Sequence, residues 1–161
     1  MEKTEAEKDI TIEEADPAEA AELLEVQKRA FMIEAERYGA YSMPPLTETV
    51  QELREAFGAS TFLKAETGGR IVGVVRSTRR DDTCLIGRLA VEPEEQDRGI
   101  GTALLKAAES RCGDAERLEL FVGSKSYRNI HIYEKMGYQT YRSENVRDDI
   151  NLLYMEKRRP A

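Results

Sequence analysis

The sequence predicts an α/β domain built on a mixed sheet of six to seven strands, with helices on both faces of the sheet. Two observations predict it. Segments with strand-like apolar runs alternate along the chain with segments whose apolar residues recur at helical spacing. In addition, the apolar run over residues 84–91, broken by Gly87 and Arg88, is followed by an acidic proline turn and a glycine-bearing helix start. A buried strand that turns into an apolar helix is typical of a sheet covered by helices.

Turn and capping residues place the individual elements. Asp16 and Pro17 provide an N-cap and a first helical position, so a helix is expected to begin there. Gly68 and Gly69 form a tight turn between two strand-like segments, which predicts a hairpin. Pro93 cannot donate to a strand ladder, so the strand before it must end. The expected order is βααβββαβαββ, over residues 9–13, 16–37, 47–58, 61–66, 70–77, 84–91, 99–112, 117–122, 126–136, 138–143 and 150–157.

The chain is expected to form one domain. Residues 1–8 are charged and polar, and we expect them to be a flexible N-terminal segment. Residues 9–158 contain no internal repeat, low-complexity tract or linker-like stretch. A length of 161 residues is enough for one domain with a normal core.

Composition narrows the possible classes of function. The chain is 40% hydrophobic and 34% charged, as in globular proteins. Its formal net charge of −7 argues against a nucleic-acid surface, which needs a basic face. No apolar run approaches the roughly 20 residues that cross a membrane, and the charged N-terminus lacks the apolar core of a signal peptide. We therefore expect a cytoplasmic protein that binds neither a membrane nor a nucleic acid.

Cysteine and histidine are too few to suggest a metal centre. The two cysteines, Cys84 and Cys112, do not predict a disulfide framework or a metal site. Cys84 is expected to be a small buried hydrophobic residue at the start of its strand, and Cys112 to be partly exposed at the end of its helix. The single histidine, His131, is interpreted as a surface residue. No metal is expected.

Two glycines stand at the start of the helix over residues 99–112. Each of them, Gly99 and Gly101, weakens a helix by roughly 1 kcal/mol relative to alanine, so a compensating role is expected. One role is the approach of a negatively charged group to the free N–H groups of the first helical turn. The other is a plain turn with close packing between helix and strand. Arg98 within the turn favours an anion, whereas the Gly-Lys-Ser/Thr ending of a nucleotide-hydrolysing loop is absent.

Two segments resemble those of a known enzyme family. The segment Gln96-x-x-Gly99-x-Gly101, after a Leu-Ala-Val-x-Pro strand, resembles the acetyl-CoA signature of the GNAT N-acetyltransferases, Gln/Arg-x-x-Gly-x-Gly/Ala. Residues 132–138, Ile-Tyr-Glu-Lys-Met-Gly-Tyr, are similar to that superfamily's Leu-Tyr-Glu-Lys-x-Gly-Phe segment and follow in the usual order. The resemblance covers residues 10–157. It implies acetyl-CoA as cofactor and transfer of its acetyl group to a primary amine by direct attack in a ternary complex.

The resemblance also implies which residues contact the cofactor. Leu89, Ala90 and Val91 would pair with the pantetheine amides through backbone groups left free where two parallel strands part. The family's asparagine, seven positions before the motif tyrosine, is replaced by Ser126, while Asn129 stands where alanine is common. Either of these two residues could contact CoA, or Ser126 could cap its helix. The pyrophosphate would be held by the loop residues Gln96, Asp97, Arg98, Gly99, Ile100, Gly101 and Thr102.

The chemistry of acyl transfer requires a proton for the departing thiolate and a neutral amine. Tyr133 holds the position of the tyrosine that serves many of these enzymes as general acid, and its phenol is protonated at neutral pH. The alternative is that Tyr133 only packs beneath the cofactor. The general base is not defined by the sequence, and a water chain is an alternative to any side chain. The candidate bases are Glu34, Glu36, Glu92 and Glu119, each of which could also be an ordinary surface charge.

The acceptor is expected to lie against the first two helices, the loop over residues 38–45 and the hairpin over residues 138–151. This implies a small molecule or peptide amine, without choosing between them, and a homodimer is the default assembly. An alternative function is a non-catalytic module that binds CoA or an acyl-CoA as a sensor or regulatory subunit. Two further rivals are an enzyme for another acyl group or acceptor and a nucleotide-binding domain. The expected acceptor-binding residues are Glu34, Tyr38, Tyr41, Glu119 and Tyr141.

Overall fold

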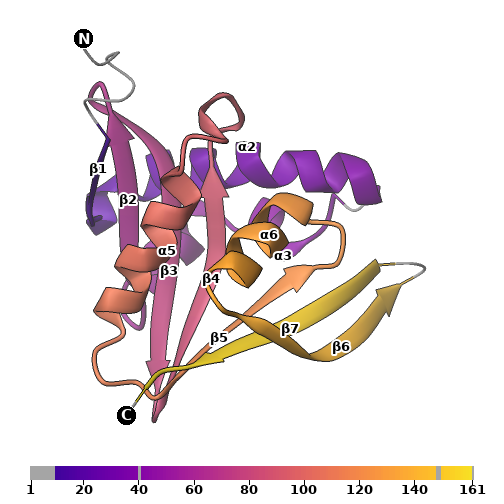
Figure 1. The fold of residues 1–161 in the computed structure, drawn as a ribbon. Helices are drawn as coiled ribbons and strands as arrows, with labels where there is room; N and C mark the ends of the chain where they lie inside the picture. Colours follow the sequence, from indigo (N-terminus) through magenta and orange to yellow (C-terminus); the bar gives the residue numbers. More distant parts are fainter. Residues whose placement is uncertain (1–9, 40, 148–149, 161) are drawn as a thin grey trace, which may run out of the picture.

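The protein is a seven-stranded mixed sheet with helices on both faces, as seen in a computed structural model (Figure 1). The structure describes residues 10–39, 41–147 and 150–160. The strands lie in the order β1-β2-β3-β4-β5-β7-β6. The elements are β1 (Thr11–Glu14), η1 (Pro17–Glu19), α2 (Ala20–Tyr38), α3 (Pro44–Thr47), α4 (Val50–Ala56), β2 (Thr61–Thr67), β3 (Arg70–Arg80), β4 (Thr83–Val91), η2 (Pro93–Glu95), α5 (Ile100–Arg111), β5 (Arg117–Gly123), α6 (Tyr127–Lys135), β6 (Gln139–Arg147) and β7 (Ile150–Arg158).

The predicted order of strands and helices is confirmed, with differences at helix starts. Asp16 is the expected N-cap, and its carboxylate accepts a hydrogen bond from the Ala18 N–H in a capping box. Asp16 therefore caps the short 3-10 helix η1, and α2 follows directly after η1. The second predicted helix, α4, starts later than predicted, because Thr49 and not Thr47 forms the capping box with Glu52. The interruption after α2 also contains the short helix α3, and part of the predicted hairpin turn, residues 148–149, lies outside the described residues.

Each face of the sheet has its own apolar core. In Figure 1, α5 lies in front of the sheet and α2 behind it. Leu23 of α2 and Leu53 of α4 pack with strand residues such as Phe62 on one face. On the other face, Leu104 and Leu105 of α5 pack with residues of β2 to β5, of β7 and of α6. The sheet is therefore held from both sides, and alternate strand residues are divided between the two cores.

The central strands β4 and β5 are paired along only part of their length. Parallel pairing joins Thr83–Leu85 to Arg117–Glu119, and no further pair between these strands follows in the described ladder. β4 continues to Val91, while β5 pairs with β7 along its whole length. Figure 1 shows the two strands diverging, with α6 drawn between them. Arg88 has a φ of 50° at an irregular point of β4, where the register with β3 shifts. The expected parting of two parallel strands is confirmed.

The prediction that Cys84 is buried is confirmed, but the predictions for its bonding and for Cys112 were wrong. Cys84 and Cys112 form a disulfide, with their Cα atoms 5.8 Å apart. Both are buried, so Cys112 is not partly exposed as predicted. The reason is topological: α5 runs back along the sheet, so its last turn returns to the beginning of β4, 28 residues earlier in the chain. The Cα separation lies in the usual range for disulfides.

Among the described residues, no helix is both long and apolar enough to span a membrane. His131 is exposed, as expected.

Candidate active site

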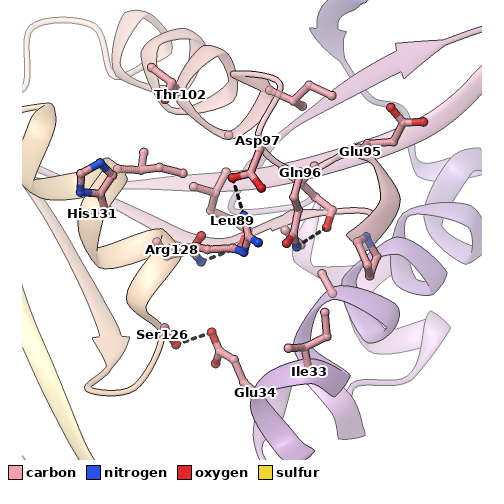
Figure 2. A pocket seen from close by; sticks show the side chains of 18 of the residues that line it. Ile33, Glu34, Leu89, Glu95, Gln96, Asp97, Thr102, Ser126, Arg128 and His131 are labelled. Atoms are coloured by element: carbon pink, nitrogen blue, oxygen red, sulfur yellow. Dashed lines mark hydrogen bonds and ion pairs between the residues drawn. The ribbon is translucent and has the colours of Figure 1, made fainter. Parts of the chain in front are cut away.

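A cavity of about 560 Å³ lies beside the end of β4 that is not paired with β5. Figure 2 shows its walls, which come from β4, the loop and first turn of α5, α6, and α2 on the other side. Its size is in the range of pockets that bind small molecules and cofactors. Most of the predicted cofactor-binding residues line it: Leu89, Ala90, Val91, Gln96, Asp97, Gly99, Ile100, Gly101, Thr102, Ser126 and Asn129.

The β4 wall presents backbone groups that two amide side chains contact. The Nδ2 of Asn129 donates to the carbonyl of Leu89 at 3.3 Å. The Nε2 of Gln96 donates to the carbonyl of Val91 at 3.2 Å. Both side chains hold the end of β4 where β5 no longer pairs with it. The consequence is an extended strand edge along the cavity, the arrangement to which a ligand's amides can add as a further strand.

The start of α5 forms the next wall, and Gly99 is its N-cap. Gly99 has a φ of 79°, a backbone conformation that residues other than glycine rarely adopt. A Cβ built there would have no heavy atom within 4 Å, so the space above it is open to the cavity. Gly99 has no side chain to bond the first N–H groups of α5, which lack partners within the helix. This 12-residue helix can therefore attract an anion at its N-terminus.

Gly101 has a different role. A Cβ on Gly101 would lie 2.9 Å from Cδ1 of Ile132, a contact too close for real side chains. The second glycine of the motif therefore faces Ile132 of α6, and a larger residue there would require the end of that side chain to move. Of the two roles considered for the glycines, open approach fits Gly99 and close packing fits Gly101.

Charged side chains surround the glycine loop. Arg128 of α6 forms an ion pair with Asp97, and the guanidinium lowers the pKa of that carboxyl. Lys135 and His131 also line the cavity. Arg98 pairs with Glu95 and is not among the lining residues, although the sequence suggested that its side chain would assist there. The positive charge at the cavity is therefore contributed mainly by α6.

Glu34 and Ser126 meet across the cavity. Ser126 precedes α6, but its hydroxyl does not cap that helix; it donates instead to Oε1 of Glu34, which projects from α2 (Figure 2). Burial raises the pKa of Glu34, and this effect outweighs the opposing hydrogen bond from Ser126 and the charge of Arg37. Glu34 thus joins the α2 wall to the α6 wall at the parted strands.

Tyr133 lies next to the cavity rather than on its wall. Its side chain is only 4% exposed and belongs to the core beneath α5, with its ring centroid 6.0 Å from that of Tyr138. Burial raises the pKa of its phenol, and the charge of Glu34 raises it further. The hydroxyl is therefore held in its protonated form.

The other predicted acceptor residues do not line the cavity. Glu119 accepts hydrogen bonds from Arg117 and Tyr141 on the part of β5 that is paired with β4. Tyr41 is 58% exposed. The side chain of Tyr38 lies outside what the structure describes. Of the five residues expected at the acceptor, Glu34 is the one that the structure brings to the cavity.

The cavity residues of α2 were missed by sequence reasoning, Glu34 excepted. Phe31, Ile33 and Arg37 all line the wall that faces the glycine loop. The available signal was the spacing of Phe31 and Arg37, each three residues from Glu34, because residues three and four apart share a helix face. Among the residues that the structure describes, no group of three potential metal ligands gathers.

The fold and cavity define the class of protein. A model of the acetyltransferase (GNAT) domain matches residues 27–159. Parted central strands beside a glycine-led helix agree with this assignment. The chain belongs to the GNAT acetyltransferase family.

Solved structures share this fold. PaiA N-acetyltransferase of Thermoplasma acidophilum, in complex with coenzyme A, is 18% identical with a TM-score of 0.75, over 93% of this chain and 99% of that chain. YncA of Salmonella typhimurium, with its cofactor acetyl-CoA, is 20% identical with a TM-score of 0.69, over 92% and 93%. The ribosomal-protein-S18-alanine N-acetyltransferase of Escherichia coli is 17% identical with a TM-score of 0.72, over 91% and 92%.

A curated relative is similar in sequence. The UPF0157 protein YqkA of Bacillus subtilis (strain 168) is 29% identical over 134 residues, which are 83% of this chain. The match spans 38% of the length of that protein.

Proposed function

We propose that this protein transfers an acetyl group from acetyl-CoA to a primary amine of a small molecule or peptide, by direct attack within a ternary complex. The observation that carries the proposal is the cavity wall formed by the part of β4 that is not paired with β5 and by the first turn of α5. Similar folds have been solved with coenzyme A or acetyl-CoA. Membership of the GNAT acetyltransferase family supports the same reaction.

The residues present fit the cofactor. The backbone of Leu89 to Val91 would hold the pantetheine arm, and the N–H groups after Gly99 would hold the pyrophosphate. Arg128 would exchange its contact with Asp97 for one with a phosphate oxygen. Acetyl-CoA supplies an acetyl thioester whose carbonyl carbon an amine can attack. Tyr133 would protonate the sulfur as it leaves, because its phenol is held neutral by burial.

The first test is thermal unfolding with acetyl-CoA, CoA and ATP in parallel. A ligand at 100-fold excess over its Kd stabilises the folded state by about 2.7 kcal/mol. We expect acetyl-CoA and CoA, but not ATP, to raise the Tm. Thiol release should then be measured with the twenty amino acids, spermidine, and tripeptides that begin with alanine or serine. Absence of a shift with both CoA species would contradict the proposal.

One observation favours a second function, a CoA-binding module without turnover. The general acid proposed above, Tyr133, is buried and does not line the cavity. If CoA raises the Tm but no amine in the panel causes thiol release, this second function is the better account. Cytoplasmic location and homodimer formation stay predictions.

A further inference from the structure

We propose that Glu34 is the base that takes the proton from the acceptor amine, and that Ser126 positions its carboxylate. The assignment rests on the proposed acetyl transfer and adds the proton acceptor that the sequence left open. It is drawn from the place of Glu34 at the parted strands, where α2 and α6 face each other across the cavity.

The other candidate bases are held elsewhere. Glu92 is 1% exposed and accepts hydrogen bonds from Arg29 at 2.8 and 3.0 Å. Glu119 is bonded by Arg117 at 2.8 Å on the paired part of β5. Glu36 is exposed and does not line the cavity. These three carboxylates therefore have structural partners or lie in solvent.

Two further carboxylates line the cavity, and both are neutralised by arginine. Glu95 pairs with Arg98, and Asp97 pairs with Arg128, each at the glycine loop. Over residues 10–39, 41–147 and 150–160, Glu34 is the cavity carboxylate without an ion pair. A carboxylate that is not paired with a cation is the better base.

The surroundings of Glu34 make it suitable for this role. Ser126 donates to one carboxylate oxygen, which orients the group and leaves the other oxygen for an amine. The titratable groups that interact with it are the cationic Arg37 on α2 and the neutral phenol of Tyr133 on α6. The β4 wall contributes the apolar Leu89. The other titratable residues on the cavity walls are Glu95, Asp97, Arg128, His131 and Lys135.

The proton balance closes between these two groups. The neutral amine forms the C–N bond with the thioester carbonyl carbon, and Glu34 takes one N–H proton. The C–S bond breaks with its electron pair going to sulfur, and Tyr133 gives sulfur its proton. The proton on Glu34 then returns through solvent to the phenolate of Tyr133. The sum is an amine and an acetyl thioester giving an amide and a thiol, with both side chains restored.

The test compares Glu34→Gln with Glu36→Gln. The second variant is a matched control, because it makes the same change two residues further along α2, on the exposed side of the helix. The acceptor is the amine that gives the fastest thiol release in the panel above. We expect Glu34→Gln to lower kcat by on the order of 100-fold, because general base catalysis contributes about that much or more. The KM for acetyl-CoA should stay within about 3-fold. Glu36→Gln should behave as wild type.

The pH profile distinguishes a base from a structural residue. In wild type, kcat should fall at low pH as Glu34 is protonated, and this limb should be absent in Glu34→Gln. Ser126→Ala should move the limb to higher pH, because the lost hydrogen bond had stabilised the carboxylate. Ser126→Thr, which keeps the hydroxyl, should restore it. A purely structural role would leave the position of the limb unchanged in every variant.

The unfolding of Glu34→Gln gives a readout that needs no acceptor. The raised pKa of Glu34 means that its ionisation costs stability as pH rises through that value. Glutamine lacks this cost, so Glu34→Gln should gain Tm relative to wild type as pH increases. Full kcat and an intact acid limb in Glu34→Gln would overturn the assignment while acetyl transfer stands. Failure of wild type to bind acetyl-CoA or release thiol would overturn both.

Discussion

The two ends of β4 differ in what they do. At the first end, Thr83–Leu85 pair with β5, and Cys84 is bonded to Cys112. At the second end, β4 has parted from β5, and Leu89 to Val91 form a cavity wall. One strand therefore carries a closed half, which anchors the fold, and an open half, which presents backbone to a ligand.

The same division separates two carboxylates. Glu119 lies in the closed half, opposite Leu85, and Arg117 and Tyr141 hold its pKa below the usual value despite partial burial. Glu34 lies at the open half, where burial raises its pKa. Position relative to the parting of the strands, rather than residue type, therefore decides which carboxylate is available for chemistry. Changes in the open half should affect binding and turnover, and changes in the closed half should affect stability.

The largest effect is expected from Gly99→Glu, in the open half. A side chain and a negative charge would enter the space above the first turn of α5, so the Tm shift with acetyl-CoA should be lost entirely. Gly69→Glu is the matched control, because Gly69 also has a positive φ, 74°, but lies in a hairpin turn. Retained micromolar binding by Gly99→Glu would argue against the cofactor site.

Tyr133→Phe should have the next largest effect. Loss of the proton donor should lower kcat by on the order of 100-fold, with little change in the Kd for CoA. Tyr138→Phe is the control, since it removes another buried hydroxyl from the same core, one that donates to Glu109 at 2.7 Å. An unchanged kcat in Tyr133→Phe would show that the tyrosine only packs.

Reduction of the disulfide tests the closed half. A loop with a sequence separation of 28 residues is worth about 3.5 kcal/mol in the chain-entropy relation. The double variant Cys84→Ala, Cys112→Ala should therefore lose roughly 10 °C in Tm. Its Kd for acetyl-CoA at a temperature where it is folded should remain within about 3-fold of wild type. If a reducing agent leaves the Tm of wild type unchanged, the closed half does not depend on this bond.

The smallest effect on turnover is expected from Glu119→Gln. Its kcat should stay within about 2-fold of wild type, because the carboxylate is occupied by Arg117 and Tyr141. The lowered pKa means that Glu119 stabilises the folded state above its unfolded pKa, and that this contribution is lost as pH falls through the folded value. The variant should thus lose Tm at neutral pH and match wild type in acid. A large fall in kcat would place Glu119 in the acceptor site after all.

Most of the fold could be predicted from local patterns. The capping box at Asp16 and the glycine turn at Gly68 act within a few residues, so the chain near them is sufficient to identify them. The start of α4 was misplaced although a local signal was present: Glu52 follows Thr49 at capping-box spacing, whereas Val50 stands at that place after Thr47. The candidate site was predictable where it lies in one segment, as in the loop from Gln96 to Thr102.

The strand, the turn and the glycine-led helix start that line the cavity were predictable from the sequence, because each is formed by residues that are neighbours along the chain. Tertiary structure alone decided that Cys84 meets Cys112, that Gly101 makes room for Ile132, and that Glu34 reaches Ser126. Each of these contacts joins residues far apart in the chain. The distances between these residues depend on how the helices pack against the sheet. The local pattern of apolar residues along the sequence carries no information on that packing.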